Sequence, residues 1–177
     1  MSNYEVERKF LLKNLPKLKF DKIFYIEQYY LKDNDGYSDR VRKIEERDEK
    51  TLYLRTLKKR KTNRASEDIE TEISEKEFRK FKKNYKSGII KIRHIINNGG
   101  FKWEIDKFKN INLIMAEVEI ITNSNNLDET INEINEVKLP NFIEDNLIME
   151  VSDFKSFSNR SLSLSNKQWD TYLPYSL

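Results

Sequence analysis

Charged residues spaced two apart recur along this chain of 177 residues. The first group is Glu5-Val6-Glu7-Arg8-Lys9. Carboxylates suit hard, oxygen-ligated cations such as Mg²⁺ or Mn²⁺, whereas Arg and Lys suit phosphate oxygens. Similar spacings return in Arg40-Val41-Arg42, Thr56-Leu57-Lys58, Asp68-Ile69-Glu70-Thr71-Glu72, Lys91-Ile92-Arg93, Glu104-Ile105-Asp106 and Glu117-Val118-Glu119. A site that offers both kinds of group fits a metal-complexed polyphosphate.

The composition excludes several other kinds of chemistry. The absence of Cys rules out disulfides, thiol catalysis and Cys-type zinc sites, and a single His argues against a His metal site or a Ser-His-Asp triad. With 33 basic and 30 acidic residues the net charge is +3, which argues against dedicated nucleic-acid or membrane-surface binding. No apolar run reaches 18 residues. We therefore expect a cytoplasmic protein with no nucleic-acid or membrane partner, either a monomer or a homodimer.

The apolar pattern mostly has period two, which is typical of strands with one polar and one apolar face. It predicts strands over 4–12, 24–31, 38–46, 50–58, 67–73, 89–97, 100–108, 114–121 and, more weakly, 147–152. The Asn98-Gly99 step predicts a tight hairpin between two of them. Without a linker or an internal repeat, we expect one domain over residues 1–177. Its predicted class is α+β, mainly β, because eight or nine antiparallel strands with flanking helices indicate a barrel or a strongly curved sheet.

Two helices are predicted from capping patterns. Ser74 with Glu77 begins one, and Asn126 with Glu129 begins the other. A third, short helix is expected near 15–23. The aromatic residues of the C-terminal tail, which are Trp169, Tyr172 and Tyr175, are expected to pack against the barrel or to plug one of its mouths.

The two faces of these strands allow two interpretations. Taken singly, each charged face is typical of an ordinary strand that faces solvent. Taken together, the strands of a closed barrel must turn one face toward a lumen. In the first strand, Val6 and Phe10 on the apolar face would pack outward, so that Glu5, Glu7 and Lys9 point inward. A charged lumen must hold water, ions or a charged ligand, because burying so many charges dry is prohibitive.

The opening Glu5-Val6-Glu7-Arg8-Lys9-Phe10 resembles the E-x-E-x-K signature of the CYTH domain, the triphosphate tunnel metalloenzymes. Later segments resemble that family in the same order along nearly the whole chain. They are I-E-Q-Y-Y-L (26–31), Arg40-Val41-Arg42, Thr56-Leu57-Lys58, Glu70-Thr71-Glu72-Ile73, Lys91-Ile92-Arg93-His94, Trp103-Glu104-Ile105-Asp106-Lys107-Phe108, Ala116-Glu117-Val118-Glu119, Glu150-Val151-Ser152 and Phe157-Ser158-Asn159-Arg160-Ser161-Leu162.

The resemblance implies a closed eight-stranded antiparallel β-barrel, a tunnel that binds a linear triphosphate with Mg²⁺ or Mn²⁺. It implies metal binding by Glu5, Glu7, Glu119 and Glu150, with Glu117 and Asp106 as further candidates for metal binding or for holding the bases in place. It implies phosphate binding by Lys9, Arg40, Arg42, Lys58, Lys91 and Arg93, and it marks Glu5, Glu7, Lys9, Arg40 and Glu70 as catalytic. The third acidic strand departs from the family pattern R-x-E-x-E-x-E-I. Ser66 and Asp68 stand at its first two positions and Arg64 lies two residues too early, which leaves the roles of Asp68 and Arg64 open.

Three other features have simpler explanations. The basic run Lys58-Lys59-Arg60-Lys61 is more typical of a solvated turn than of a nucleic-acid patch, and we expect only Lys58 to have the phase of the site. His94 is expected on the outer face, and Trp103 in the core.

The expected function is a metal-dependent triphosphatase that hydrolyses inorganic tripolyphosphate to diphosphate and phosphate. Without Cys or a suitable His, direct attack by water is favoured over a covalent phospho-enzyme. Three alternatives stay open at this point: a class IV adenylyl cyclase, a thiamine triphosphatase, and a non-catalytic module that binds polyphosphate or nucleotide. The cyclase is disfavoured because no His-Phe pair precedes the first strand. The module is disfavoured because pure phosphate binding needs bases more than five carboxylates.

Overall fold

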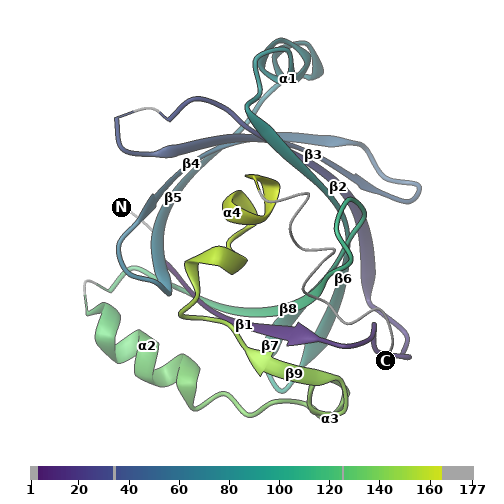
Figure 1. Cartoon of the computed structure of the whole chain (residues 1–177), viewed down its shortest axis with the longest axis vertical. Helices are drawn as coiled ribbons and strands as arrows, with labels where there is room; N and C mark the ends of the chain where they lie inside the picture. Colours follow the sequence, from purple (N-terminus) through teal and green to yellow (C-terminus); the bar gives the residue numbers. More distant parts are fainter. Residues whose placement is uncertain (1–3, 34, 125, 165–177) are drawn as a thin grey trace.

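Nine antiparallel strands form the body of the protein in a computed structural model, which describes residues 4–33, 35–124 and 126–164. The strands are β1 (Tyr4–Leu12), β2 (Lys22–Tyr30), β3 (Ser38–Glu46), β4 (Leu52–Arg60), β5 (Ala65–Glu72), β6 (Ser87–Asn98), β7 (Phe101–Phe108), β8 (Ile114–Thr122) and β9 (Leu147–Glu150). Eight of them follow one another in the order β5-β4-β3-β2-β6-β7-β8-β1, and β1 pairs with β5 to close the ring (Figure 1). The predicted closed eight-stranded barrel is thus confirmed.

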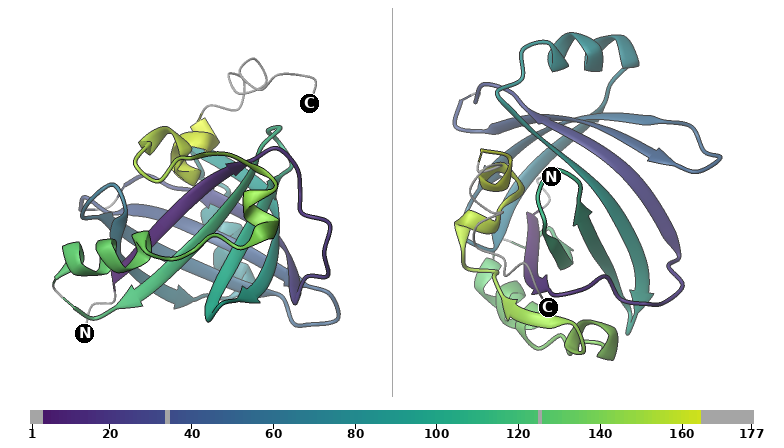
Figure 2. Two further views of the ribbon diagram at one scale, coloured as in Figure 1. Left: turned by 90° about the horizontal axis from the view of Figure 1, so that it is seen from below. Right: turned by 45° about the vertical axis from the view of Figure 1, so that its right-hand side comes forward.

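Strand β1 closes the barrel by sharing one of its edges between two partners. Its first edge pairs with β8 from Tyr4 to Leu11. On the other edge, Tyr4–Val6 pairs with β5, whereas Phe10–Leu12 pairs with β9. Strand β9 is therefore a ninth strand outside the closed ring, and α2 (Leu127–Asn135) and α3 (Asn141–Glu144) lie on the outside next to it (Figure 2).

The helices are α1 (Glu75–Lys82), α2 (Leu127–Asn135), α3 (Asn141–Glu144) and α4 (Asn159–Leu164), with a 3-10 turn η1 (Lys155–Phe157) before α4. The capping box of Ser74 and Glu77 is formed at α1, and Asn126 caps α2 by accepting from the backbone of Glu129. In Figure 1, α1, α2 and α3 lie outside the ring, whereas α4 lies over the barrel mouth. None of the described helices is long and apolar enough to cross a membrane.

The apolar faces of the strands pack outward, as the alternation predicts. Val6, Phe10 and Trp103 are buried against Ile134 of α2 and Ile143 of α3. A second apolar cluster lies on the lumen side of the strands. Leu11 belongs to it and shares a face of β1 with Lys9, which it follows by two residues. It contains Leu11, Ile89, Phe108, Met115 and, from α4, Leu162. One end of the barrel is therefore filled by apolar side chains beneath α4.

The prediction of a short helix near 15–23 is wrong. Residues 13–21 form no helix, and β2 already begins at Lys22. Asp21 ties this segment to β6 instead: its N–H donates to the carbonyl of Ile95 at 2.8 Å, and its carboxylate accepts from the N–H of Asn97 at 2.8 Å. These bonds, with Phe20 packed on the core, outweigh local helical preference.

The hairpin predicted from Asn98-Gly99 is confirmed, with Asn98 paired to Phe101. Gly99 and Gly100 form its tip with φ of 62° and 83°, in the left-handed region that glycine adopts without a Cβ clash. The short helices α3 and α4 and the turn η1 were not predicted. Trp169, Tyr172 and Tyr175, which were expected to pack on the barrel or to plug it, lie outside the described residues.

Candidate functional site

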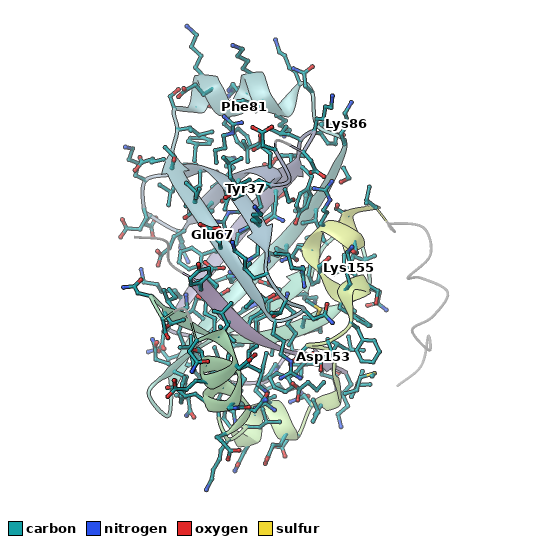
Figure 3. The ribbon with its side chains drawn as sticks, turned by 90° about the vertical axis from the view of Figure 1, so that its left-hand side faces the viewer. Tyr37, Glu67, Phe81, Lys86, Asp153 and Lys155 are labelled. Carbon is teal, nitrogen blue, oxygen red and sulfur yellow. The ribbon has the colours of Figure 1, made fainter. Side chains whose placement is uncertain are left out.

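A cavity of about 910 Å³ occupies the barrel lumen. Its charged lining residues are the bases Lys9, Arg40, Arg42, Lys58, Arg60, Lys91, Arg93, Lys102, Lys155 and Arg160 and the acids Glu5, Glu7, Glu67, Asp68, Glu70, Glu104, Glu117 and Glu119. The structure thus brings together all the predicted site residues except Asp106 and Glu150. The lining comes from all eight strands of the closed ring and from η1 and α4. Figure 3 labels two of these residues, Glu67 on β5 and Lys155 on η1.

Three neighbouring strands, β1, β8 and β7, form an acidic wall of this cavity. The register places Glu7 directly opposite Glu119, and Glu117 directly opposite Glu104. Directly opposed residues have Cβ atoms only about 4.5–5.5 Å apart, and like charges in such positions destabilise a sheet. Two such acidic pairs on adjacent strands are therefore maintained only with cations beside them.

Two lysines supply part of that compensation. Lys9 Nζ lies 2.7 Å from Glu7 Oε1 and 3.7 Å from Glu117 Oε1. Lys102 Nζ lies 2.9 Å from Glu104 Oε1 and 3.0 Å from Glu119 Oε1. Burial alone would raise the pKa of Glu7, but Lys9 and Lys58 lower it to about 2. The pKa of Glu119 is raised instead, by burial and by repulsion from Glu104 that Lys102 only partly offsets. The acidic wall thus retains unrelieved negative charge.

The lining from β3 and β4 forms a basic wall with Arg40, Arg42, Lys58 and Arg60, and the adjacent β5 adds the acids Glu67, Asp68 and Glu70. Lys58 Nζ lies 3.1 Å from Glu5 and 3.2 Å from Asp68, and Arg40 contacts Asp68 at 3.5 Å. Arg42 pairs with Glu70, which also accepts a hydrogen bond from Thr56.

Not every donor of this basic wall is used. The Nε atoms of Arg40 and Arg42 are buried and have no hydrogen-bond partner among the described residues. Burial and repulsion from Arg40 lower the pKa of Arg42 to about 10. An anion such as phosphate would accept hydrogen bonds from these unused donors and would reduce the repulsion between the cations.

Asp106 lies behind the lining and holds two of the predicted phosphate ligands. Its side chain is completely buried and accepts from Arg93 at 2.8 and 2.7 Å, and it also pairs with Lys91. Burial would raise the pKa of Asp106, but Arg93 and Lys91 hold it far below its usual value. Of its two predicted roles, the contacts match the holding of the bases.

Glu150 is not placed in the lumen, contrary to the prediction of an acidic ring. Its carboxylate accepts from Arg8 at 3.1 and 2.9 Å and from Ser152 at 2.6 Å, and it lies 3.6 Å from Arg64. The reason is topological, because β9 pairs with β1 outside the closed ring. Arg8 also donates to backbone carbonyls at the end of α2. Arg8 and Glu150 thus form a clasp on the outer surface that joins β1, β9 and α2.

The structure also places the residues whose roles were open. Asp68 lines the cavity, whereas Arg64 pairs with Asp153 on the outside at 2.7 Å. The expectation that only Lys58 of its basic run has the phase of the site is wrong, since Arg60 lines the cavity too. Lys102 was missed as well. The alternation could have found both residues, because Arg60 lies two residues after Lys58 and Lys102 lies two residues before Glu104.

The residues contributed by α4 and the segment before it were also missed. Lys155 and Arg160 line the cavity, and Arg160 donates to Asp33 at 2.5 Å and to Ser38 at 2.8 Å. No alternation signal could have found them. His94 lies on the outer face as predicted, with its ring 4.6 Å from that of Phe20, and Trp103 lies in the core as predicted, at 1% exposed.

The residues present fit a hard divalent cation by their chemistry. Two buried carboxylate oxygens, Glu117 Oε1 and Asp68 Oδ1, accept no hydrogen bond from the described residues. Oxygen-only donors suit Mg²⁺ or Mn²⁺. Within the described part of the chain, no group of three or more Asp, Glu, His or Cys side chains is already arranged to hold a metal. The ion pairs of the acidic wall explain this, because lysines stand between its carboxylates.

The fold and the cavity together define the class of this protein: a closed antiparallel barrel whose lumen carries an acidic and a basic wall. The solved structure of the inorganic triphosphatase NE1496 shares this fold. It is 23% identical, covers 91% of this chain and 95% of that chain, and has a TM-score of 0.60. No protein-family model and no curated protein matches the chain.

Two further structures show how widely the fold is used. The protein PH1819 from Pyrococcus horikoshii OT3 has a TM-score of 0.65 at 16% identity, covering 90% of this chain and 97% of that one. A chain of the Mediator head module of Schizosaccharomyces pombe has a TM-score of 0.53 at 11% identity, covering 83% and 98%. At these identities the likeness is one of fold alone, and it agrees with the predicted closed barrel. The activity has to be argued from the site.

Proposed function

We propose that this protein is a divalent-metal-dependent triphosphatase that hydrolyses inorganic tripolyphosphate to diphosphate and phosphate in the barrel lumen. The observation that carries the proposal is the division of the cavity into two walls. On the basic wall, the buried Nε atoms of Arg40 and Arg42 have no hydrogen-bond partner among the described residues. On the acidic wall, Glu7 of β1 lies directly opposite Glu119 of the neighbouring β8. A metal-complexed polyphosphate complements both walls at once, because it carries negative oxygens and a bound cation.

The bases would bind and orient the phosphate chain. Arg40 and Arg42 offer unused donors, and Lys91 and Arg93 are held in fixed positions by Asp106. Fixed, desolvated cations stabilise charge that moves onto the leaving phosphate oxygen without reorganising at that moment.

The acids would hold the cation and the attacking water. Glu7 and Glu119, with Glu5, would hold a Mg²⁺ or Mn²⁺ ion, which when bound draws negative charge off the phosphate oxygens. Asp68 Oδ1 and Glu117 Oε1, which accept no hydrogen bond from the described residues, would accept one from a water molecule and so orient it for in-line attack.

The alternatives make different demands on the same cavity. A cyclase needs a pocket for adenine and a base near the ribose, and a thiamine triphosphatase needs a surface for the thiamine ring. Three of the described lining residues are large and hydrophobic: Ile69 and Ile121, which are 49% and 61% exposed, and Tyr30, which is 3% exposed and supplies the one aromatic ring among them. A single ring offers no two-sided stacking surface for adenine or thiamine. A non-catalytic module would have no need of the opposed carboxylates, which destabilise the empty barrel.

The test is phosphate release from tripolyphosphate, ATP and thiamine triphosphate, each with Mg²⁺, with Mn²⁺ and with EDTA. The proposal expects tripolyphosphate to be hydrolysed far faster than the others, and only with metal. Pyrophosphate and cyclic AMP formed from ATP would identify a cyclase instead. Binding of tripolyphosphate without turnover under any metal condition would identify a binding module.

A further inference from the structure

Lys102 holds the position of a cation between two carboxylates of the acidic wall. Its Nζ lies 2.9 Å from Glu104 Oε1 and 3.0 Å from Glu119 Oε1, and the two strands are paired up to Trp103 and Val118, the residues next to Lys102 and Glu119. Both carboxylates line the cavity. A lysine ammonium is a compact point charge on a flexible stem, so it can neutralise a carboxylate pair without any fixed coordination geometry.

Lys9 makes a comparable bridge but differs in its surroundings. Its side chain is 9% exposed and lies between Glu7 and Glu117. The side chain of Lys102 is 46% exposed, whereas those of Glu104 and Glu119 are 9% and 24% exposed. Lys9 also lines the cavity, but its buried ammonium would gain less hydration than that of Lys102 on leaving its partners. Lys102 can rotate into solvent, where its charge is hydrated, and leave the two carboxylates behind.

A further buried oxygen points to a cation at the same wall. Glu117 is 8% exposed, and its Oε1 accepts no hydrogen bond from the described residues. Glu117 lies directly opposite Glu104 and two residues before Glu119 on the lumen face of β8. When Lys102 leaves, Arg93 stays paired with Glu104 and 3.6 Å from Glu117, whereas Glu119 keeps no ion pair among the described residues. That arrangement favours a divalent cation, which neutralises more than one of these carboxylates.

We infer that Lys102 is a tethered counter-ion that competes with the divalent cation for Glu104 and Glu119, so that the metal binds only as this lysine swings out to solvent. The inference rests on the proposed metal dependence and adds a control on metal affinity. In the metal-free protein, Lys102 stabilises the opposed carboxylates. On metal binding, the protein loses two ion pairs at Lys102, and the measured affinity is reduced by that loss.

The test measures metal binding to the protein without any substrate. Mn²⁺ is titrated into the wild type, K102M and the control K107M, and the free ion is followed by electron paramagnetic resonance. Lys107 is an exposed residue of the same strand that does not line the cavity, so K107M removes the same charge from the same element. The inference expects K102M to bind Mn²⁺ about tenfold more tightly than the wild type and K107M to bind about as the wild type does.

The outcomes separate this inference from the proposed function. Equal or weaker binding by K102M, with binding by the wild type, overturns the inference and leaves the proposed metal dependence standing. No binding by any of the three proteins overturns both.

A second measurement needs no substitution: Lys102 of the wild type is labelled with an amine-acetylating reagent and quantified by mass spectrometry. The inference expects labelling of Lys102 to rise on addition of Mn²⁺ while that of Lys107 stays constant, and unchanged labelling of Lys102 overturns it.

Discussion

Glu7 of β1 and Glu119 of β8 lie directly opposite each other on the lumen side of the barrel. Each of the two carboxylates is paired with a different lysine, Lys9 for Glu7 and Lys102 for Glu119. A pair of opposed acids lowers the stability of a sheet, and its presence inside a closed barrel is consistent with binding a cation there. This relationship leads to the first prediction.

Substituting Glu7→Gln is expected to reduce kcat with Mg²⁺ by at least about 100-fold, because a metal ion supplies several kcal/mol to the transition state and each 1.36 kcal/mol is tenfold in rate. Binding of tripolyphosphate, followed by calorimetry, should persist because the basic wall is unchanged. Glu133→Gln on the exposed face of α2 is the matched control and should retain full activity. If Glu7→Gln turned over at the wild-type rate, this glutamate would have no part in metal binding.

Ligand binding is expected to stabilise the barrel, because the cations of the basic wall repel one another in the empty lumen. Tripolyphosphate with Mg²⁺ at about 100 times its Kd would add about 2.7 kcal/mol to the free energy of unfolding. For a chain of this size that corresponds to a rise in Tm of about 5–10 °C. Differential scanning fluorimetry measures it, with inorganic sulfate at equal ionic strength as the control. A Tm that tripolyphosphate and Mg²⁺ leave unmoved would count heavily against the lumen as the binding site.

Asp106→Asn is expected to raise KM for tripolyphosphate and to lower stability together. Removing one partner from a buried ion pair costs about 3–5 kcal/mol, because Lys91 and Arg93 are left with one compensating charge fewer. The same loss frees both cations from the positions in which they would contact phosphate.

Asp39→Asn is the matched control for Asp106→Asn. Asp39 is also buried, at 3% exposed, and pairs with Arg55 at 3.1 and 2.6 Å away from the cavity. It should lower Tm without changing KM. Equal changes in KM for the two variants would mean that Asp106 acts on stability alone.

Stability should depend on pH through the clasp of Glu150. Burial alone would raise the pKa of Glu150, but hydrogen bonds from Arg8 and Ser152 lower it. A lowered native pKa gives stabilisation that is present above the unfolded-chain pKa of about 4.3 and is lost as pH falls through the native value. Because the carboxylate is a third exposed, Glu150→Gln should cost only about 1–2 kcal/mol at pH 7.

Thermal unfolding from pH 7 down to pH 3 measures this effect. The difference in Tm between wild type and Glu150→Gln should shrink below about pH 4. Glu75→Gln, which removes an exposed pair with Arg79 on α1, should have almost no effect at any of these pH values. Activity of Glu150→Gln should be retained, whereas its loss in a protein that stays folded would return Glu150 to the metal site.

The sequence alone determined which side chains share a face. Alternation along a strand is a local property, so Glu5, Glu7 and Lys9 had to lie on one side of β1 and Val6 and Phe10 on the other. The capping box at α1 and the glycine hairpin are equally local. The same pattern, repeated with turns between, predicted eight or nine strands in a barrel or a strongly curved sheet, whereas the closed eight-stranded ring was implied by the family resemblance.

Only the tertiary structure decided which residues from distant segments meet. Glu150 has the residue type and the motif of a metal ligand, yet β9 pairs with β1 outside the ring and turns it to Arg8. The ion pair between Lys102 and Glu119 depends on the register of β7 and β8, which local sequence does not specify. Arg160 reaches the cavity only because α4 lies over the barrel mouth. The physical reason is the same in each case: alternation fixes a side chain relative to its own strand, whereas its partners depend on pairing and packing across the whole barrel.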